Sequence, residues 1–325
     1  MLRDLLGSAR KKALSPLKYL INLADPPVIT LIYHRVATLS SDPEMLAVSP
    51  ENFRAQMRYL KDTAQLVRFE EEWGNVSGPA VAVTFDDGYA DNVLEALPIL
   101  EDIGVPATFF VSTGTIGTTN EFWWHELERI ILGKQPLPSS FTLDHHSRRK
   151  NWPTGNINAR LAFYQEFVRL MNETDSVQRT VWLEQLRLWA QSDEQPSTMH
   201  RVMTVDELRL LGRNSLVTIG AHTVSHTQLS SLSPEEQRKE IVESKKQLEE
   251  WLGLDVTMFS YPFGKRCHYT AETISLCREA GFTKAAANFP GQAHRWTDPY
   301  QIPRHLVRNW PIETFTSKLQ EFWTR

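Results

Sequence analysis

The stretch AVAVTFDDGY, residues 80–89, leads from an apolar run directly into two carboxylates and a glycine. A short apolar run of this kind is typical of a buried strand. In barrels of parallel strands, functional side chains gather where the strands end. Successive strand residues face opposite sides, so Asp86 and Asp87 can serve two different tasks. Gly88 would let the backbone turn sharply after them.

Similar apolar runs recur along the chain and alternate with amphipathic helical segments, which indicates an α/β fold. Helix starts are well marked: Ser49 precedes a Pro-Glu pair, Thr204 and Glu207 form a capping box, and Ser233 opens a charged helix that Gly253 ends. Repeated strand–helix units give either an open doubly wound sheet or a barrel. We expect strands at Val28–Tyr33, Ala80–Phe85, Ala107–Ser112, Leu216–Ala221, Thr257–Tyr261 and Lys284–Asn288.

Composition narrows the class of protein. The chain has 325 residues, 41% of them hydrophobic, which is enough for one large core or one domain with an inserted piece. A net charge of −4 gives no sign of a nucleic-acid binder. Cys267 and Cys277 form no disulfide scaffold and fit a reducing compartment. No run of 18 apolar residues is present, so we expect no transmembrane helix.

Two segments do not follow the alternation of strands and helices. Residues 1–24 form a basic amphipathic segment whose charges interrupt its apolar residues, so a secretory signal is not expected. Residues 1–22 fit peripheral contact with a membrane, or a helix packed on the domain. We therefore expect a cytoplasmic protein, with contact to the inner face of the membrane as an option. Residues 25–325 form the main domain, with an insertion at about 118–203 that is rich in tryptophan, a residue that fills cores or stacks on sugars.

A second polar motif, His222-Thr223-Val224-Ser225-His226, follows the strand expected at Leu216–Ala221. Two histidines four apart lie on one face if the segment begins a helical turn. Together with one carboxylate of the Asp86–Asp87 pair they make three protein ligands, the set typical of a catalytic metal with an open position. A solvated Asp-Asp-Gly turn and a structural histidine pair are the alternatives from spacing alone.

The Thr-Phe-Asp-Asp-Gly-Tyr run, followed by His-Thr-x-x-His, resembles the first two motifs of the polysaccharide deacetylases, the NodB-homology family. The resemblance extends from about Val28 to Arg304. It implies a distorted (β/α)7-type barrel that removes acetyl groups from N-acetylated sugars of a polysaccharide or glycoconjugate. It also implies that Asp86 is the catalytic base and that a divalent metal is held by Asp87, His222 and His226. The ligand set suits Zn²⁺ first, with Ni²⁺ or Co²⁺ as alternatives.

The family's other two motifs depart from the usual pattern. The third corresponds to the run Phe259–Gly264, which lacks the arginine that orients the catalytic aspartate. Arg304 is the candidate replacement, and Arg266 a second one. The resemblance implies that the Phe263 amide stabilises the oxyanion, and Tyr261 lies in the same run as a substrate contact.

The last family motif is a Leu-x-His run near the C-terminus, where this chain has no histidine after residue 310. Ile32-Tyr33-His34 has the same pattern at the other end of the chain. The sequence therefore resembles a circularly permuted member, in which His34 would be the general acid.

Two other functions remain open. One is a deformylase or deacylase of a lipid-linked or small sugar. The other is a non-catalytic sugar-binding barrel, which the missing motif arginine would favour. The oligomeric state is not predicted.

Overall fold

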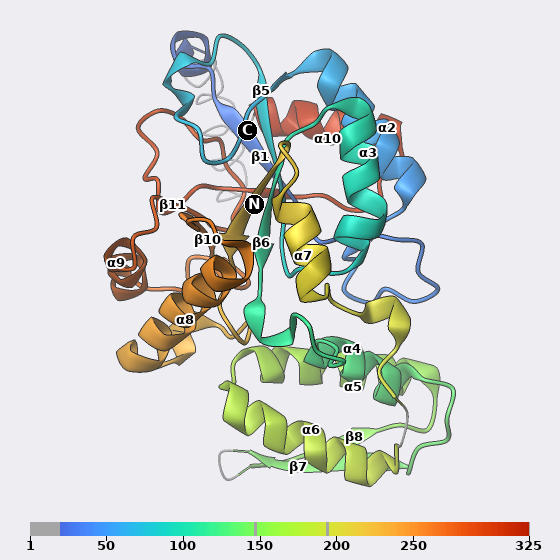
Figure 1. Cartoon of the computed structure of the whole chain (residues 1–325). Helices are drawn as coiled ribbons and strands as arrows, with labels where there is room; N and C mark the ends of the chain where they lie inside the picture. The colour runs from blue at the N-terminus through green and yellow to red at the C-terminus, as the bar shows by residue number, and fades with distance from the viewer. Residues whose placement is uncertain (1–19, 146–147, 193–194, 325) are drawn as a thin grey trace, which may run out of the picture.

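A curled sheet of parallel strands forms the centre of the computed structural model, which describes residues 20–145, 148–192 and 195–324. Along the main path the strand order is β11-β10-β9-β6-β5-β1-β12, and β4 pairs with β5 off this path. The six strands expected from the apolar runs are all present, as are the alternation of strands with helices and the barrel-like curl (Figure 1). The strands are β1 (Val28–Tyr33), β4 (Gln65–Leu66), β5 (Ala80–Phe85), β6 (Ala107–Val111), β9 (Val217–Ala221), β10 (Met258–Ser260), β11 (Lys284–Ala286) and β12 (His305–Leu306).

The barrel is distorted where its two edges approach each other. The edge strands β11 and β12 are not neighbours in the strand order of the described residues. Instead, the segment that leads into β12 first bonds to β11, through an amide of Ile302 that donates to Ala285 at 3.0 Å and an amide of Ala287 that donates to Ile302 at 2.9 Å. The same segment then pairs with β1, with His305 opposite Leu31. One irregular stretch of chain therefore bridges both edges.

The helices cover the outside of the sheet and begin where the sequence places them. Ser49 accepts a hydrogen bond from the amide of Asn52, and capping boxes at Thr204 and Ser233 satisfy the first free amides of two more helices. Gly253 ends the longest helix with a φ of 69°. These helices are α2 (Pro50–Thr63), α3 (Leu97–Ile103), α7 (Val205–Gly212), α8 (Pro234–Leu252), α9 (Ala271–Glu279) and α10 (Ile312–Thr324). Short elements in the barrel loops are β2 (Arg35–Val36), β3 (Ala47–Val48), the π-helical segment Asn92–Ala96, and the 3₁₀ turns Trp73–Asn75, Thr113–Thr115 and Leu229–Ser231.

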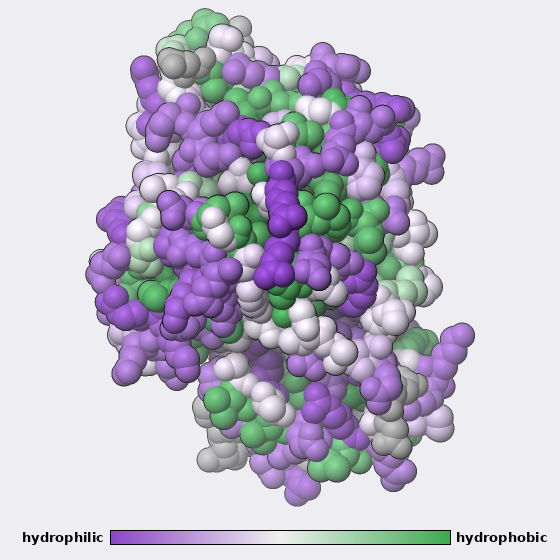
Figure 2. Space-filling view, viewed as in Figure 1, coloured by the Kyte–Doolittle hydropathy of each residue, from purple (hydrophilic) through white to green (hydrophobic). Residues whose placement is uncertain are grey.

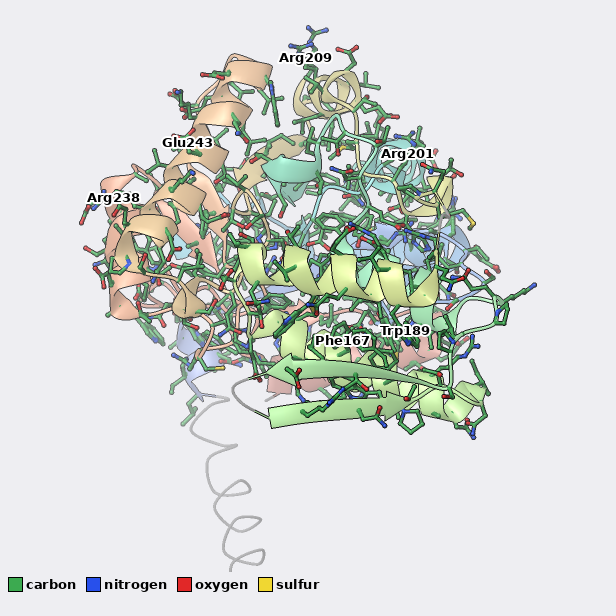
Figure 3. All side chains as sticks on the ribbon, turned by 90° about the horizontal axis from the view of Figure 1, so that it is seen from below. Phe167, Trp189, Arg201, Arg209, Arg238 and Glu243 are labelled. Carbon is green, nitrogen blue, oxygen red and sulfur yellow. The ribbon has the colours of Figure 1, made fainter. Side chains whose placement is uncertain are left out.

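Between β6 and β9 the chain leaves the barrel and forms a separate layer below the strand ends (Figure 1). Two of its helices match the helical patterns in the sequence, whereas the antiparallel hairpin was not predicted. The hairpin forms because Phe141 and Trp152, opposite each other in register, pack on Phe163, Phe167 and Trp189. Figure 3 shows Phe167 and Trp189 between the hairpin and the helices. The layer comprises α4 (Trp123–Leu127), the π-turn Glu128–Leu132, β7 (Ser140–His145), β8 (Arg148–Pro153), α5 (Ile157–Asn172), α6 (Ser176–Ala190) and the 3₁₀ turn Thr198–His200.

The surface is largely polar where the helices face outward. Figure 2 shows that the exposed side of α8 is strongly hydrophilic, in keeping with its many charged residues. Among the described residues, no helix has the length and apolar character needed to cross a bilayer. Most of the basic N-terminal segment, residues 1–19, lies outside the described residues.

Candidate active site

The carboxylate pair lies immediately after β5, at the end of the strand that faces the inserted layer. Asp86 and Asp87 are both buried, with 3% and 2% of their surface exposed. The chain turns there with a φ of 80° at Asp87 and 97° at Gly88. A Cβ atom at Gly88 would lie 3.0 Å from a methyl carbon of Val111, so glycine is required by both φ and space. This strained turn directs the two neighbouring carboxylates to different partners.

The histidine motif follows β9 as a loop, not as the helical turn on which the expected His222–His226 spacing rested. Thr223 and His226 both have positive φ values, 64° and 49°. Glu240 of α8 holds this loop by accepting hydrogen bonds from two successive amides, those of Val224 and Ser225, each at 2.9 Å. The two imidazole rings still come together, with centroids 4.8 Å apart. Sequence reasoning missed Glu240, because its position on a charged helix gave no sign of this role.

Asp87, His222 and His226 present their ligand atoms to one another within 4.8 Å. The Oδ1 atom of Asp87 lies 3.3 Å from Nε2 of His226 and 3.7 Å from Nε2 of His222. That oxygen is buried and has no hydrogen-bond partner among the described residues, as expected for an atom whose partner is a cation. His222 contacts the carbonyl of Ser260 through Nδ1 at 2.8 Å, which leaves Nε2 for a metal. The set therefore fits a divalent ion.

The protonation states of these residues suit a cation. Burial lowers the pKa of both His222 and His226, so each presents the neutral imidazole that binds a metal. Burial and then the negative charge of Asp86 raise the pKa of Asp87. Such a carboxylate needs a positive charge beside it to remain ionised.

Asp86 is held by Arg304, the residue expected to replace the missing motif arginine. The guanidinium donates to both carboxylate oxygens at 2.7 Å and is 1% exposed. Burial alone would raise the pKa of Asp86, but the charges of Arg304 and His222 and the hydrogen bonds from Arg304 lower it below its usual value. Asp86 is therefore ionised and fixed in orientation. Arg266 instead lies over the ring of Phe289, 4.0 Å from its centre.

Ser260, at the end of β10, connects both halves of the site. Its hydroxyl donates to Asp86 at 3.2 Å and accepts from Arg304 at 2.8 Å. Its carbonyl is the partner of His222 described above. Sequence reasoning quoted this serine in the third motif but gave it no role; its place at a strand end was the available signal.

The remaining expected residues lie around the same pocket. His34 follows β1 and is half-buried. Burial lowers its pKa to about 4, although the negative charge of Asp86 acts in the opposite direction. Phe263 has a φ of 59°, and its amide makes no hydrogen bond to the described residues. Tyr261 lines the pocket with its ring, but its hydroxyl donates to the carbonyl of Tyr300 at 3.0 Å. The hydroxyl of Tyr261 is thus turned toward the protein.

We call the resulting cavity, of about 450 Å³, the catalytic pocket. Trp123 and Trp124 line it from the inserted layer but are 9% and 5% exposed, so neither offers a free ring face as an open sugar platform. A larger cavity of about 890 Å³ lies beside the hairpin, and neither the Asp86–Asp87 pair nor the His222–His226 pair lines it. The catalytic pocket is lined by His34, Glu44, Leu46, Asp86, Asp87, Trp123, Trp124, Val168, Arg169, Asn172, Glu173, His222, His226, Gln228, Tyr261, Phe263, Lys265, His268, Asn288, Leu306 and Arg308.

Comparison with known proteins identifies similar sequences and folds. The profile of the family described as "Polysaccharide deacetylase" matches residues 74–285. The chain is 22% identical over 285 residues to YxkH of Bacillus subtilis (strain 168), which bears the same family name, covering 86% of this chain and 70% of that protein.

Two solved structures share the fold. One is BC0361, a polysaccharide deacetylase from Bacillus cereus, with a TM-score of 0.58, 18% identity and coverage of 91% of this chain and 69% of that one. The other is the Streptococcus pyogenes deacetylase PplD in complex with acetate, with a TM-score of 0.58, 17% identity and coverage of 91% and 99%. At these identities the likeness concerns the fold.

Proposed function

This chain belongs to the polysaccharide deacetylase family of hydrolases, and on that premise we propose that it is a metal-dependent enzyme that removes acetyl groups from N-acetylated sugars of a polysaccharide or glycoconjugate. The observation that carries the proposal is the meeting of the two motifs: Asp87, His222 and His226 converge on one point, next to the ionised Asp86. Three ligands with an open side are the arrangement of a hydrolytic metal centre.

Asp87, His222 and His226 would hold the divalent ion, Zn²⁺ first by ligand type, with Ni²⁺ and Co²⁺ as alternatives. When bound, such an ion polarises the acyl oxygen and makes water acidic enough to give a proton to a weak base. Asp86 is that weak base, because Arg304 keeps it ionised and oriented. It accepts the proton of the water that attacks the acyl carbon.

The other pocket residues complete the reaction. The free amide of Phe263 donates a hydrogen bond to the oxygen that becomes negatively charged at the acyl carbon. His34 passes a proton to the nitrogen that leaves. Because its pKa is lowered to about 4, His34 is neutral before the reaction. The proton therefore moves from the attacking water to Asp86, from Asp86 to His34, and from His34 to the leaving nitrogen. Bond by bond, water supplies a hydroxyl to the acetyl group and a proton to the amine.

The test is release of acetate from a panel of N-acetylated saccharides, with and without chelator, followed by addition of Zn²⁺, Ni²⁺ or Co²⁺. We expect activity that chelation removes and one of these ions restores. Asp86→Asn should lower kcat by about 10²- to 10⁴-fold while the metal content stays unchanged. Asp102→Asn, at an exposed aspartate of α3, is the matched control. Measuring formate beside acetate separates a deformylase, and metal binding without hydrolysis on any substrate would instead indicate a sugar-binding barrel.

Peripheral contact with a membrane, with the protein in the cytoplasm, is a separate proposal. At the end of the basic segment Leu20 and Leu23 are 59% and 70% exposed, which supports an apolar contact there. Deletion of residues 1–22 should then move the protein from the membrane fraction to the supernatant. An unchanged distribution would contradict this contact.

A further inference from the structure

Three cationic side chains line the catalytic pocket and reach it from separate parts of the fold. Arg169 comes from α5, Lys265 from the loop after β10, and Arg308 from the segment after β12. Within the described residues, none of the three lies in an ion pair with a carboxylate. This differs from Arg304, which is fully neutralised by Asp86 in the same region.

Arg308 is fixed in place through only one of its nitrogens. Its Nη1 atom donates to the carbonyl of Glu44 at 2.8 Å and to that of Met45, while the side chain is half-buried. Main-chain carbonyls hold the guanidinium but do not neutralise it. The charge of Arg308 also affects the proposed reacting groups. Together with burial and the charges of Arg304 and His222, it lowers the pKa of His34.

Besides Asp86 and Asp87, the pocket contains the carboxylates of Glu44 and Glu173, and neither forms an ion pair with Arg308 within the described residues. Glu173 is exposed, and burial raises the pKa of Glu44 although the charge of Arg308 acts in the opposite direction. The charge of Asp42 also acts on Arg308, but the two oxygens of Asp42 accept hydrogen bonds from the amides of Leu46 and Ala47. A half-buried guanidinium without a direct ion pair is costly. The planar fork of arginine matches a carboxylate or a phosphate group and can bind either through two parallel hydrogen bonds.

We propose that the acylated sugar carries a negatively charged oxygen group, a carboxylate or a phosphate, which binds to Arg308 and to the neighbouring Lys265 and Arg169. This inference rests on the proposed function, since it assigns the substrate class of the same pocket. The acyl group would lie at Asp87 and the histidine pair, and the charged group toward Arg308.

The experiment compares matched ligands by calorimetry on the full, metal-loaded chain. One pair is N-acetylglucosamine linked to glucuronic acid or to glucose. The other is N-acetylglucosamine 1-phosphate or its methyl glycoside. We expect the charged member of one pair to bind about 10- to 100-fold more tightly than its neutral partner, from the strength of a charge-assisted hydrogen bond. The pair that shows the difference identifies the source of the charge.

Arg308→Gln should abolish this difference, and Arg308→Lys should keep part of it. Arg238→Gln, on the outer side of α8, is the control and should change nothing; Figure 3 shows Arg238 at the periphery. Lys265→Gln gives a second measure if Arg308→Gln does not fold, and should reduce the preference severalfold.

Equal affinities within both pairs, or no binding of any of the four ligands, would overturn the inference. So would a preference that Arg308→Gln leaves at its full size, because Arg308 would then contribute nothing to binding of the anion. Failure of the proposed function gives a different result, namely no acetate released from any N-acetylated saccharide in the panel.

Discussion

Two clusters in this protein contain the same side chains, two histidines and one carboxylate, and their surroundings suit them to different tasks. In Asp87, His222 and His226, and again in His125, Glu128 and His200, the ligand atoms lie within 4.8 Å of one another. We call the second group the insertion cluster, because its residues lie in the inserted layer.

Two nitrogens of the insertion cluster already have protein partners, whereas Nδ1 of His125 lies 3.5 Å from Glu128 and makes no hydrogen bond within the described residues. The rings of His125 and His200 stack with centroids 4.0 Å apart and planes 17° apart, so their in-plane nitrogen lone pairs run parallel and do not converge. Nη1 of Arg35 lies 2.7 Å from Nδ1 of His200, and the hydroxyl of Tyr89 lies 2.8 Å from Nε2 of His125. A buried guanidinium thus lies against one of the nitrogens that a metal ion would need.

The cluster of Asp87, His222 and His226 has the opposite features. Its imidazole planes are inclined by 66°, both Nε2 atoms face one carboxylate oxygen, and that oxygen has no hydrogen-bond donor. The nearby arginine, Arg304, is neutralised by Asp86. Ligand type and distance are therefore insufficient to define a metal site. The direction of the lone pairs and the charge of the neighbours decide it.

The largest expected effect concerns the metal content of the two clusters. His226→Ala should lose the metal and lower kcat by about 10³-fold or more, since the cation is worth several kcal/mol in the transition state. His200→Ala, the matched change in the insertion cluster, should keep one ion per chain. Elemental analysis of both purified variants checks this. Two ions per chain in the wild type, or loss of the ion in His200→Ala, would show that the insertion cluster also binds a metal.

Arg35 is the residue that gives the insertion cluster its structural character. It is 1% exposed, pairs with Asp91 at 2.9 Å, and lies over the ring of Tyr89. Arg35→Met leaves the half-buried Asp91 without its ionic partner, so the free energy of unfolding should fall by about 3–5 kcal/mol. Arg54→Met, which breaks an exposed ion pair with Asp102, should cost about 0–1 kcal/mol. Urea unfolding measures both changes in the free energy of unfolding. Equal losses would contradict a larger contribution from the Arg35–Asp91 pair.

The barrel could be predicted from sequence because each of its elements carries a local signal. Apolar runs mark the strands, and Thr204 with Glu207 marks a helix start by a hydrogen-bond pattern within four residues. The hairpin in the insertion was missed because its period-two pattern is short. Only Phe141, Leu143 and Trp152 alternate with polar residues there, and neighbouring prolines indicate a loop.

The candidate catalytic groups were predictable one at a time, but their neighbours were not. Asp86, Asp87 and the histidine pair stand in recognisable motifs at strand ends. Ser260 and Glu240 act through contacts between residues far apart in the chain, 174 positions in the case of Ser260 and Asp86. No local pattern encodes such contacts. The insertion cluster was missed for the same reason, because the chain between His125 and His200 must fold before the two rings meet.

The pKa of His34 predicts how the stability of the protein depends on pH. Its pKa falls to about 4 on folding, so as the pH drops below about 6.5 the unfolded chain takes up a proton that the folded chain refuses. Wild-type stability should therefore decrease toward pH 4 relative to His34→Asn, by at most about 3 kcal/mol and less because the ring keeps some solvent contact.

The measurement is urea unfolding of both chelator-treated proteins at pH 7 and pH 5. At pH 7 the histidine is neutral in both states, so this ionisation adds nothing there. The His34→Asn variant removes only this titration, whereas the carboxylates of the site titrate in both proteins. Parallel pH profiles for the two proteins would show that His34 is not perturbed by burial.

The smallest effect concerns Tyr89, which joins the two clusters through one hydroxyl. That hydroxyl accepts from Nε1 of Trp124 at 3.0 Å and contacts His125, while the ring of Trp124 packs edge-on against His226, with centroids 5.1 Å apart. Tyr89→Phe leaves two buried polar atoms without a partner and should cost about 2 kcal/mol. Tyr269→Phe, which removes one bond to Gln301, should cost about 1 kcal/mol or less. Thermal unfolding and metal content measure the pair: if Tyr89→Phe weakens metal binding as well as stability, the insertion cluster also helps to position His226, and the two clusters are a single unit.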